Sequence, residues 1–229
     1  PCPVAVKRAV IEWFGPVVLE YYAATEGTGS FVGSAEWLER PGTVGRPAVA
    51  GHVRVLDPTS GEDKAPGEVG TVYLRAPRVG RFDYYGDDAK TAGSYLGDYF
   101  TMGDVGYLDE DGYLFLTDRS ADLIISGGVN VYPAEVEAEL LGHPSVADAA
   151  VIGVPDDEWG EMVVAVVEPS PGVAADDALG AELMAHCRDR LAHFKCPRRV
   201  DFTDALPRTD SGKLYKRRLR EQYRAAVEG

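Results

Sequence analysis

Residues 118–137 read DRSADLIISGGVNVYPAEVE, and this stretch decides the fold of the second half of the chain. An apolar run at 123–126 predicts a short strand, and Gly127-Gly128 then forms a turn without side chains. Pro133 is suited to the first turn of the helix that we expect at 132–141. The double glycine has two explanations at this point: a well-capped strand-turn-helix, or a close backbone approach by a narrow ligand.

Beyond this stretch, strand and helix patterns alternate to the end of the chain. Apolar runs at 146–154 and 162–168 predict strands, and a shorter strand is expected at 198–202. Asp176 and Asp177 start a helix that we expect to run to about residue 192. A last helix, rich in Lys and Arg, begins at Leu214. We therefore expect a small α+β domain over residues 119–229.

Before residue 119 the pattern is that of short strands joined by turns. Residues 4–14 space their apolar side chains as in a helix, and an extended run at 17–22 follows. From 43 to 75, and again from 99 to 118, β-rich segments alternate with Pro, Gly and Asp turns, and Glu110-Asp111-Gly112 predicts a hairpin. The chain is thus expected to be α+β, with a β-barrel-like subdomain within residues 1–118 and a boundary near Arg119.

The composition restricts the class of partner. The chain has 229 residues with 23 Lys+Arg and 37 Asp+Glu, a formal net charge of −14. This balance opposes binding to nucleic acid or to an anionic lipid surface, and no apolar run approaches the roughly 20 residues of a membrane span. The three cysteines follow neither a disulfide nor a zinc pattern, so we expect a protein of the reducing cytoplasm.

A small-residue turn follows the extended run, in YYAATEG at residues 21–27. Small residues let a ligand approach the backbone closely. Here Tyr22 could lie flat on a base, Thr25 could donate to a phosphate oxygen, and Glu26 could bind a hard cation such as Mg²⁺. A loop with a solvated Glu26 and packed tyrosines explains the same residues equally well.

Asp104 and Arg119 lie at the two ends of the predicted hairpin. A carboxylate on a glycine turn, as in MGD at 102–104, can accept both vicinal hydroxyls of a ribose, and Arg119 could reach the same sugar. Taken alone, each residue is better explained as a turn Asp bonded to its own backbone and as a surface Arg.

Lys213 lies in a turn-rich loop, LPRTDSGK at 206–213, ahead of the last helix. Small residues let its ammonium project, and a mobile cation suits charge that shifts between a carboxylate and an α-phosphate. A solvated lysine is the ordinary alternative. Two loop aromatics, Trp159 and Phe194, have a similar ambiguity: stacking on a phosphorylated nucleotide competes with core packing.

Together these segments resemble the adenylate-forming superfamily, and specifically its acyl-CoA synthetases. The resemblance rests on YYAATEG (21–27), GTVGRP (42–47), MGD (102–104), DRSADLIISGGVNVYPAEVE (118–137) and LPRTDSGKLYKRRLR (206–220), in the family's order and with similar separations. It implies the end of a large adenylation domain, including its β-barrel subdomain, over 1–118. It also implies a small C-terminal lid domain over 119–229 that turns about a hinge near Arg119–Ala121.

The resemblance also implies a role for each candidate residue. Lys213 would be the catalytic lysine of adenylation, bridging the substrate carboxylate and the α-phosphate of ATP. Residues of the first domain would hold the nucleotide and its metal: Tyr22 on adenine, Thr25 on phosphate, Glu26 on Mg²⁺, and Asp104 with Arg119 on ribose. After the lid turns, Gly127 and Gly128 would lie against the pantetheine arm of CoA.

The chain departs from the family's usual pattern at several positions. Ala23 stands where Gly is common, Met102 where Thr is common, and Ala121 where a charged residue is common. The Ser/Thr/Gly-rich phosphate loop of the family is not found in these residues, and Pro1 is not an initiator Met. We therefore expect the C-terminal portion of a longer synthetase, inactive on its own.

The resulting hypothesis is an AMP-forming acid–thiol ligase. It activates a carboxylic acid, of the fatty-acid or a related type, with MgATP to acyl-AMP and then transfers the acyl group to CoA. A second hypothesis is an acyl-AMP ligase that loads a carrier protein, and a third is an inert or merely nucleotide-binding fragment. Comparing free CoA with a carrier protein separates the first two, and ATP/pyrophosphate exchange tests the third.

Overall fold

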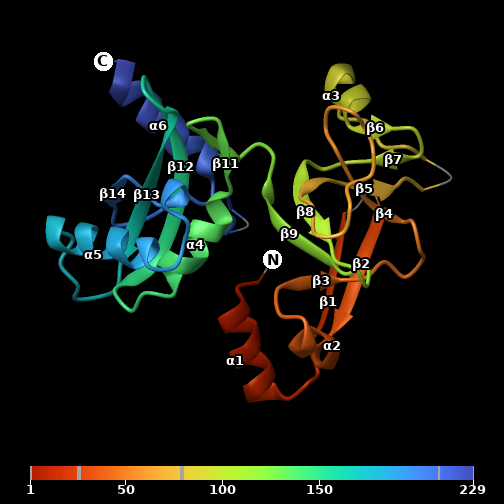
Figure 1. The fold of residues 1–229 in the computed structure, drawn as a ribbon, viewed down its shortest axis with the longest axis horizontal. Helices are drawn as coiled ribbons and strands as arrows, with labels where there is room; N and C mark the ends of the chain where they lie inside the picture. The colour runs from red at the N-terminus through yellow and green to blue at the C-terminus, as the bar shows by residue number, and fades with distance from the viewer. Residues whose placement is uncertain (1, 25–26, 78–79, 211, 229) are drawn as a thin grey trace. The chain divides into compact units, whose positions relative to one another are not determined.

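The computed structural model describes residues 2–24, 27–77, 80–210 and 212–228, and it divides the chain between Ser120 and Ala121 into two units (Figure 1). Unit 1 spans Pro1–Ser120 and unit 2 spans Ala121–Gly229. The division falls just after Arg119 because this residue still belongs to a strand of unit 1, where it pairs with Asp104. No helix in the described part of the chain is long and apolar enough to cross a membrane.

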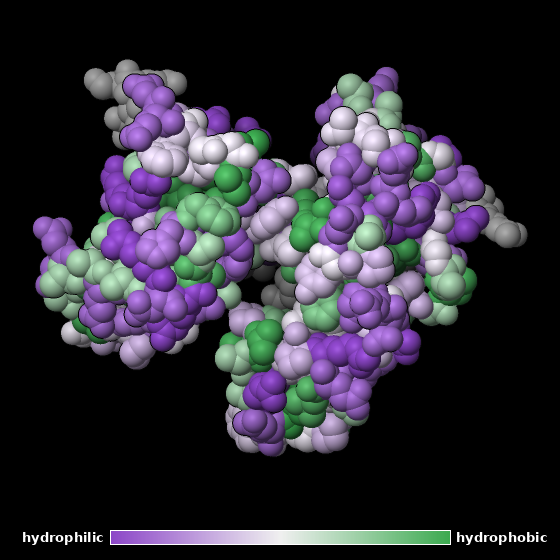
Figure 2. Space-filling view, in the orientation of Figure 1, coloured by the Kyte–Doolittle hydropathy of each residue, from purple (hydrophilic) through white to green (hydrophobic). Residues whose placement is uncertain are grey.

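Unit 1 begins with helix α1 (Val4–Phe14), at the bounds that the sequence predicts, and Gly15 follows it with a φ of 81°. A two-stranded antiparallel sheet and a short helix complete this end of the unit: β1 (Leu19–Ala24), β2 (Gly27–Gly33) and α2 (Ser34–Glu39). Ile11 of α1, Val32 of β2 and Trp37 of α2 form a small core. Figure 2 shows further hydrophobic surface at this end of unit 1. Trp13 of α1 is 81% exposed.

The rest of unit 1 is a seven-stranded sheet of order β3-β9-β8-β5-β7-β6, in which β4 also pairs with β5. Its elements are β3 (Thr43–Gly45), β4 (Val53–Leu56), β5 (Gly70–Arg75), α3 (Asp88–Gly93), β6 (Tyr95–Leu96), β7 (Tyr99–Phe100), β8 (Asp104–Leu108) and β9 (Leu114–Arg119). The sheet is open, because no ladder joins its end strands within the described residues. The end strands β3 and β6 are only three and two residues long, and this series of short strands is the β-barrel-like subdomain that the sequence predicts.

The predicted hairpin joins β8 to β9 and fixes the ends of both strands. Asp109 Oδ1 accepts the N–H groups of Asp111 and Tyr113 at 3.0 and 2.8 Å, and Gly112 has a φ of 80°. The ladder that follows places Asp104 opposite Arg119. Beneath it lies a core of buried side chains: Val44, Val53, Val55, Val72, Leu74, Phe100 and Leu114. Burial of each large apolar side chain contributes about 1.5–3 kcal/mol to the stability of the fold.

Unit 2 is a five-stranded sheet of order β11-β10-β13-β12, with β14 parallel to β13. Its strands are β10 (Ile124–Ser126), β11 (Val129–Val131), β12 (Val146–Asp156), β13 (Gly160–Pro169) and β14 (Arg199–Phe202). Its helices are α4 (Pro133–Leu141), α5 (Asp177–Arg188), the 3₁₀ turn η1 (His193–Lys195) and α6 (Lys216–Glu228).

Helices cover both faces of this sheet. Along β12, successive residues alternate between two cores: Val151 packs with Leu140 of α4 and Leu183 of α5, whereas Ile152 packs with Leu219 of α6. Both faces are buried, so β12 and β13 read as continuous apolar runs rather than as an alternating pattern.

Two helix bounds in unit 2 differ from those that the sequence predicts. The α5 helix ends at Arg188 rather than near residue 192, because Ala192 is extended, with a ψ of 137°. The α6 helix begins at Lys216 rather than Leu214, because Leu214 forms a bridge with Arg208 and the Tyr215 N–H donates to the Pro207 carbonyl at 2.8 Å.

Candidate functional site

In unit 1, the structure brings together Tyr22, Asp104 and Arg119, which the sequence predicts as nucleotide contacts. Tyr22 lies in β1, Asp104 is the first residue of β8 and Arg119 is the last residue of β9. The Tyr22 hydroxyl donates a 2.6 Å hydrogen bond to Oδ2 of Asp104, and Nε of Arg119 lies 3.4 Å from Oδ1. Groups from separate strands therefore hold both oxygens of the carboxylate.

The Asp104 carboxylate is nearly buried, whereas Arg119 is open to solvent: their side chains are 12% and 65% exposed. Burial, and then the negative charge of Asp104, raise the pKa of Tyr22 far above its ordinary value, and Arg119 opposes this only in part. Tyr22 therefore remains a hydrogen-bond donor at neutral pH. Since a carboxylate oxygen has two lone pairs, Asp104 keeps acceptor sites for the hydroxyls of a ligand.

An irregular ladder and a glycine bring Tyr22 to this position. The β1–β2 register shifts between Tyr22 and Ala23, and such bulges re-aim side chains next to binding sites. Across the ladder, a Cβ at Gly29 would lie 2.8 Å from the Tyr22 ring. Any larger residue there would therefore clash with the ring in its observed position. Sequence reasoning misses Gly29, and the signal that could have found it is the glycine-rich run GTGSFVG at 27–33.

Thr25 and Glu26, the predicted phosphate and Mg²⁺ contacts, lie outside the described residues. Among the residues that are described, no group of three or more His, Cys, Asp or Glu side chains could hold a metal ion. The roles of Thr25 and Glu26 thus stay predictions.

In unit 2, Gly127 and Gly128 form the turn of the β10–β11 hairpin. Their φ angles are 58° and 78°, the type I′ geometry that favours glycine at both positions. The Gly127 N–H donates to the Trp159 carbonyl at 2.8 Å, and a Cβ at Gly127 would lie 3.0 Å from the Trp159 ring. The turn and Trp159 therefore explain Gly127, while a Cβ at Gly128 would have no heavy atom of the described residues within 4 Å.

Trp159 also has a cation beside it. The guanidinium of Arg198 lies 3.8 Å from the centre of the Trp159 ring. Core packing, one of the two explanations for the loop aromatics, is wrong for Phe194, which is 47% exposed. The tip of the glycine hairpin thus adjoins an aromatic ring and a positive charge in the same unit.

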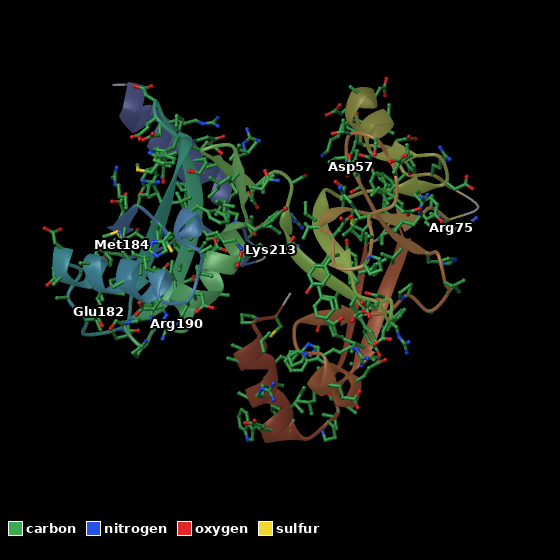
Figure 3. All side chains as sticks on the ribbon, viewed as in Figure 1. Asp57, Arg75, Glu182, Met184, Arg190 and Lys213 are labelled. Carbon is green, nitrogen blue, oxygen red and sulfur yellow. The ribbon has the colours of Figure 1, made fainter. Side chains whose placement is uncertain are left out.

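Lys213 is exposed on the loop ahead of α6 (Figure 3). Its ammonium forms no ion pair with the residues that the structure describes. Lys216, by contrast, is nearly buried and its Nζ lies 2.7 Å from Oε1 of Glu137. Lys213 therefore keeps a mobile charge, whereas Lys216 is part of the packing between α6 and α4.

The two units offer different chemistry. Unit 1 presents an oriented carboxylate, a phenol and a guanidinium, which together suit the diol of a ribose. Unit 2 presents a mobile ammonium on one loop and a side-chain-free turn beside an aromatic ring. Each set agrees in residue type with the predicted roles, which remain predictions.

Two family profiles match the chain. The profile described as AMP-binding enzyme matches residues 1–82, and the profile described as AMP-binding enzyme C-terminal domain matches residues 135–213. They describe two parts of one kind of enzyme, and together they cover more than half of the chain.

Named relatives are CoA ligases. The chain is 46% identical over 189 residues to feruloyl-CoA synthase of an Amycolatopsis species, and 37% identical over 212 residues to the long-chain-fatty-acid–CoA ligase FadD13 of Mycobacterium tuberculosis. The matches cover 82% and 92% of this chain but 38% and 41% of the relatives. The chain therefore spans about two fifths of the length of the curated relatives it matches.

A solved structure has the same fold. It is o-succinylbenzoate CoA synthetase (MenE) from Bacillus subtilis in complex with the acyl-adenylate intermediate OSB-AMP, with a TM-score of 0.81 and 34% identity. The match covers 97% of this chain and 44% of that one. Profiles, relatives and fold agree, and the chain belongs to the family of AMP-binding, adenylate-forming enzymes.

Proposed function

We propose that the protein is an AMP-forming acid–thiol ligase. A carboxylate oxygen of the acid attacks the α-phosphorus of ATP, the bond from this phosphorus to the bridging oxygen breaks, and acyl-AMP and pyrophosphate form. The thiol of CoA then loses its proton and attacks the acyl carbon, which releases AMP and gives acyl-CoA. Membership of the family and the names of the relatives support this proposal.

The observation that carries the proposal is the Asp104 carboxylate held between Tyr22 and Arg119. A ribose offers two neighbouring O–H donors, and one oriented carboxylate can accept both. The exposed guanidinium of Arg119 adds donors and positive charge next to the same sugar. In the proposed set the Tyr22 ring also lies on adenine.

The remaining roles follow the family resemblance. Unit 1 acts as the end of the large adenylation domain and unit 2 as the lid, with a hinge near Arg119–Ala121. Thr25 contacts phosphate and Glu26 holds Mg²⁺, a hard cation for which a carboxylate oxygen is a suitable ligand. Lys213 bridges the acid and the α-phosphate and stabilises the charge that develops between them. Its exposure and its lack of an ion pair among the described residues support this role.

The second half-reaction would use the glycine hairpin of unit 2. The pantetheine arm of CoA is narrow, and the open space beside Gly128 leaves room for it. Trp159, with Arg198 stacked on its ring, offers an aromatic surface and a positive charge for the phosphorylated adenosine end of the same molecule.

The acid is proposed only by class. The relatives are named for a feruloyl group, a long-chain fatty acid and o-succinylbenzoate, yet all match this chain at 34–46% identity. Relatives named for different acids thus match this chain at similar identity, so the match does not name the acid, and a fatty or related carboxylic acid is the finer proposal. The three free cysteines support a reducing compartment such as the cytoplasm.

A hybrid enzyme tests the proposal. The chain replaces the matching segment of the Amycolatopsis feruloyl-CoA synthase, and the unmodified synthase is the control. Lys213→Ala should lower adenylation, followed by pyrophosphate release, roughly 100-fold. It should spare thioester formation from supplied feruloyl-AMP and CoA. Equal loss of both half-reactions contradicts the role of Lys213, and acyl transfer only to a phosphopantetheinylated carrier protein would favour the carrier-loading alternative.

The 229-residue chain gives a second test without the hybrid. Calorimetry should detect AMP binding that Asp104→Asn weakens, while ATP/pyrophosphate exchange by the chain alone is expected to be absent. Exchange at a measurable rate would overturn that last expectation. An Asp104→Asn variant that binds AMP with full affinity would contradict the proposed contact of Asp104 with the ribose.

A further inference from the structure

Hydrogen bonds between its own residues close the loop that carries Lys213. The Thr209 N–H donates to the Lys213 carbonyl at 2.8 Å, and the Lys213 N–H donates to Thr209 Oγ1 at 3.2 Å. Gly212 has a φ of 80° within this loop. The Gly212 N–H also donates to the Thr209 carbonyl at 2.8 Å. None of these three bonds involves the Gly212 carbonyl, and glycine adopts many backbone angles at little cost.

Arg208 ties this loop to the central sheet of unit 2. Nη1 of its guanidinium donates to the Gly212 carbonyl at 2.7 Å, and Nη2 pairs with the carboxylate of Asp148 in β12. Asp148 is itself oriented, because its Oδ1 accepts the Ala149 N–H at 2.9 Å. One planar guanidinium therefore connects a strand to the peptide that directly precedes Lys213.

This arrangement is better suited to positioning than to stability. The side chains of Arg208 and Asp148 are 44% and 22% exposed, and ion pairs open to solvent contribute little to folding. The Gly212 carbonyl and the Lys213 nitrogen belong to one planar peptide, so a bond to that carbonyl fixes the direction in which Lys213 leaves the loop. Arg208→Lys replaces the two guanidinium nitrogens that bond the Gly212 carbonyl and the Asp148 carboxylate with a single ammonium group.

We propose that Arg208, oriented by Asp148, is a positioning residue for Lys213 during adenylation. The inference rests on the proposed function of Lys213. It explains how an exposed ammonium can be held in one position at the reacting phosphate. Without Arg208 the Gly212–Lys213 peptide samples other orientations, and the ammonium spends less time at the reacting phosphate. The loss falls on kcat of adenylation, while KM for ATP and the thioester step stay unchanged.

The first test uses the whole 229-residue chain. Arg208→Gln and Asp148→Asn are compared with Arg217→Gln, a control that breaks the exposed pair of Arg217 with Glu221 on α6. Amide hydrogen exchange should become about tenfold faster at residues 209 and 213 in the first two variants only. Unchanged exchange there overturns the proposal. Faster exchange throughout β12 also overturns it, because Arg208 would then support the fold rather than the loop.

The second test uses the hybrid with feruloyl-CoA synthase. We expect Arg208→Gln to lower kcat of adenylation about tenfold at unchanged KM for ATP, and Arg208→Lys to recover only part of the loss. Full activity in Arg208→Lys overturns the role of the two-armed guanidinium.

Lys213→Ala in the same hybrid separates the two ideas. If it abolishes adenylation while Arg208→Gln keeps full kcat, the positioning role is wrong and the proposed function stands. If Lys213→Ala keeps adenylation, the role of Lys213 itself is wrong, and the positioning role falls with it.

Discussion

The hydroxyl of Tyr22 donates to the carboxylate of Asp104 across 82 residues of sequence, and this bond joins the β1–β2 sheet to the seven-stranded sheet of unit 1. The Tyr22 ring also packs against the core of the larger sheet. Because Arg119 faces the other oxygen of Asp104, the carboxylate is oriented before a ligand arrives. Pre-orientation of this kind lowers the entropic cost of binding.

Tyr22→Phe removes this hydroxyl and keeps the ring. A hydrogen bond to a charged group contributes about 1.5–3 kcal/mol, so we expect the Kd of the chain for AMP to rise about tenfold. Tyr21→Phe is the matched control, because the neighbouring Tyr21 is exposed. Calorimetric titration measures both variants, and an equal effect of the two substitutions would contradict the assigned contact.

The raised pKa of Tyr22 also predicts how stability depends on pH. Below about pH 10, where an unfolded tyrosine is still protonated, the stabilising contribution of Tyr22 is fully present. Above that pH the unfolded chain loses the phenol proton while the folded chain keeps it. The free energy of unfolding should then fall by up to about 1.4 kcal/mol per pH unit until the folded-state pKa is reached.

Urea denaturation from about pH 8 to 11 measures this slope. Tyr22→Phe should flatten it. Tyr223 of unit 2 contributes separately, because burial and its hydrogen bond to Asp201 raise its pKa as well, so Tyr223→Phe is the second variant. Burial also raises the pKa of Cys187 to about 11, so part of the slope should remain in the double variant, whereas a slope equal to that of the unmodified chain would show that neither phenol is responsible.

Short-range patterns allowed much of this fold to be predicted. Helix α1 has its predicted bounds because its apolar spacing and Gly15 lie within one segment. Asp104 and Arg119 could be paired in advance because a short hairpin sets their register. A turn at the double glycine is a property of those two residues themselves, whereas the strand β11 that follows it was not predicted.

Contacts between distant residues could not be predicted. The bond of Tyr22 to Asp104, the stacking of Arg198 on Trp159 and the pair of Arg208 with Asp148 each join residues that are ordinary by themselves. How the strands of the expected barrel-like subdomain are ordered, β3-β9-β8-β5-β7-β6, also depends on such distant contacts. The catalytic and binding roles of the site residues stay predictions.

The two glycines of the hairpin should differ in their tolerance of alanine. Both have positive φ, which costs a non-glycine residue about 1–2 kcal/mol. At Gly127 the new Cβ also meets the Trp159 ring at 3.0 Å, whereas at Gly128 it meets open space. We expect Gly127→Ala to destabilise unit 2 by about 1–3 kcal/mol more than Gly128→Ala. Urea denaturation compares them, and equal losses would mean that Trp159 moves aside freely.

Two lysines lie close together in sequence, and replacing each with methionine should change the stability of the protein by different amounts. Lys216 and Glu137 are 11% and 14% exposed and paired at 2.7 Å. Lys216→Met removes the cation beside the nearly buried Glu137, which still accepts the Val151 N–H at 2.7 Å, and we expect a loss of about 3 kcal/mol in the free energy of unfolding. Lys213→Met should cause no measurable change, because its ammonium is exposed. Thermal unfolding of both variants checks this, and similar losses would contradict the contrast.

Among the residues near the proposed hinge, Ala121 is the one at which a substitution should affect the proposed lid rotation most. On one side, the Ser120 N–H donates to the Gly103 carbonyl at 2.7 Å and ties residue 120 to unit 1. On the other, Nη1 of Arg220 lies 2.7 Å from the Asp122 carboxylate and ties residue 122 to unit 2. Ala121 can therefore change its backbone angles without breaking either bond.

Proline at this position holds φ near −65° and restricts the residue before it. In the hybrid enzyme we expect Ala121→Pro to suppress thioester formation about tenfold or more while adenylation continues, because in the proposed mechanism only the second half-reaction requires the lid to turn. Ala121→Gly, which permits the rotation, is the control. Single-turnover measurements of AMP release separate the two steps. If the Ala121→Pro enzyme forms feruloyl-CoA at the full rate, Ala121 is not the pivot of the rotation.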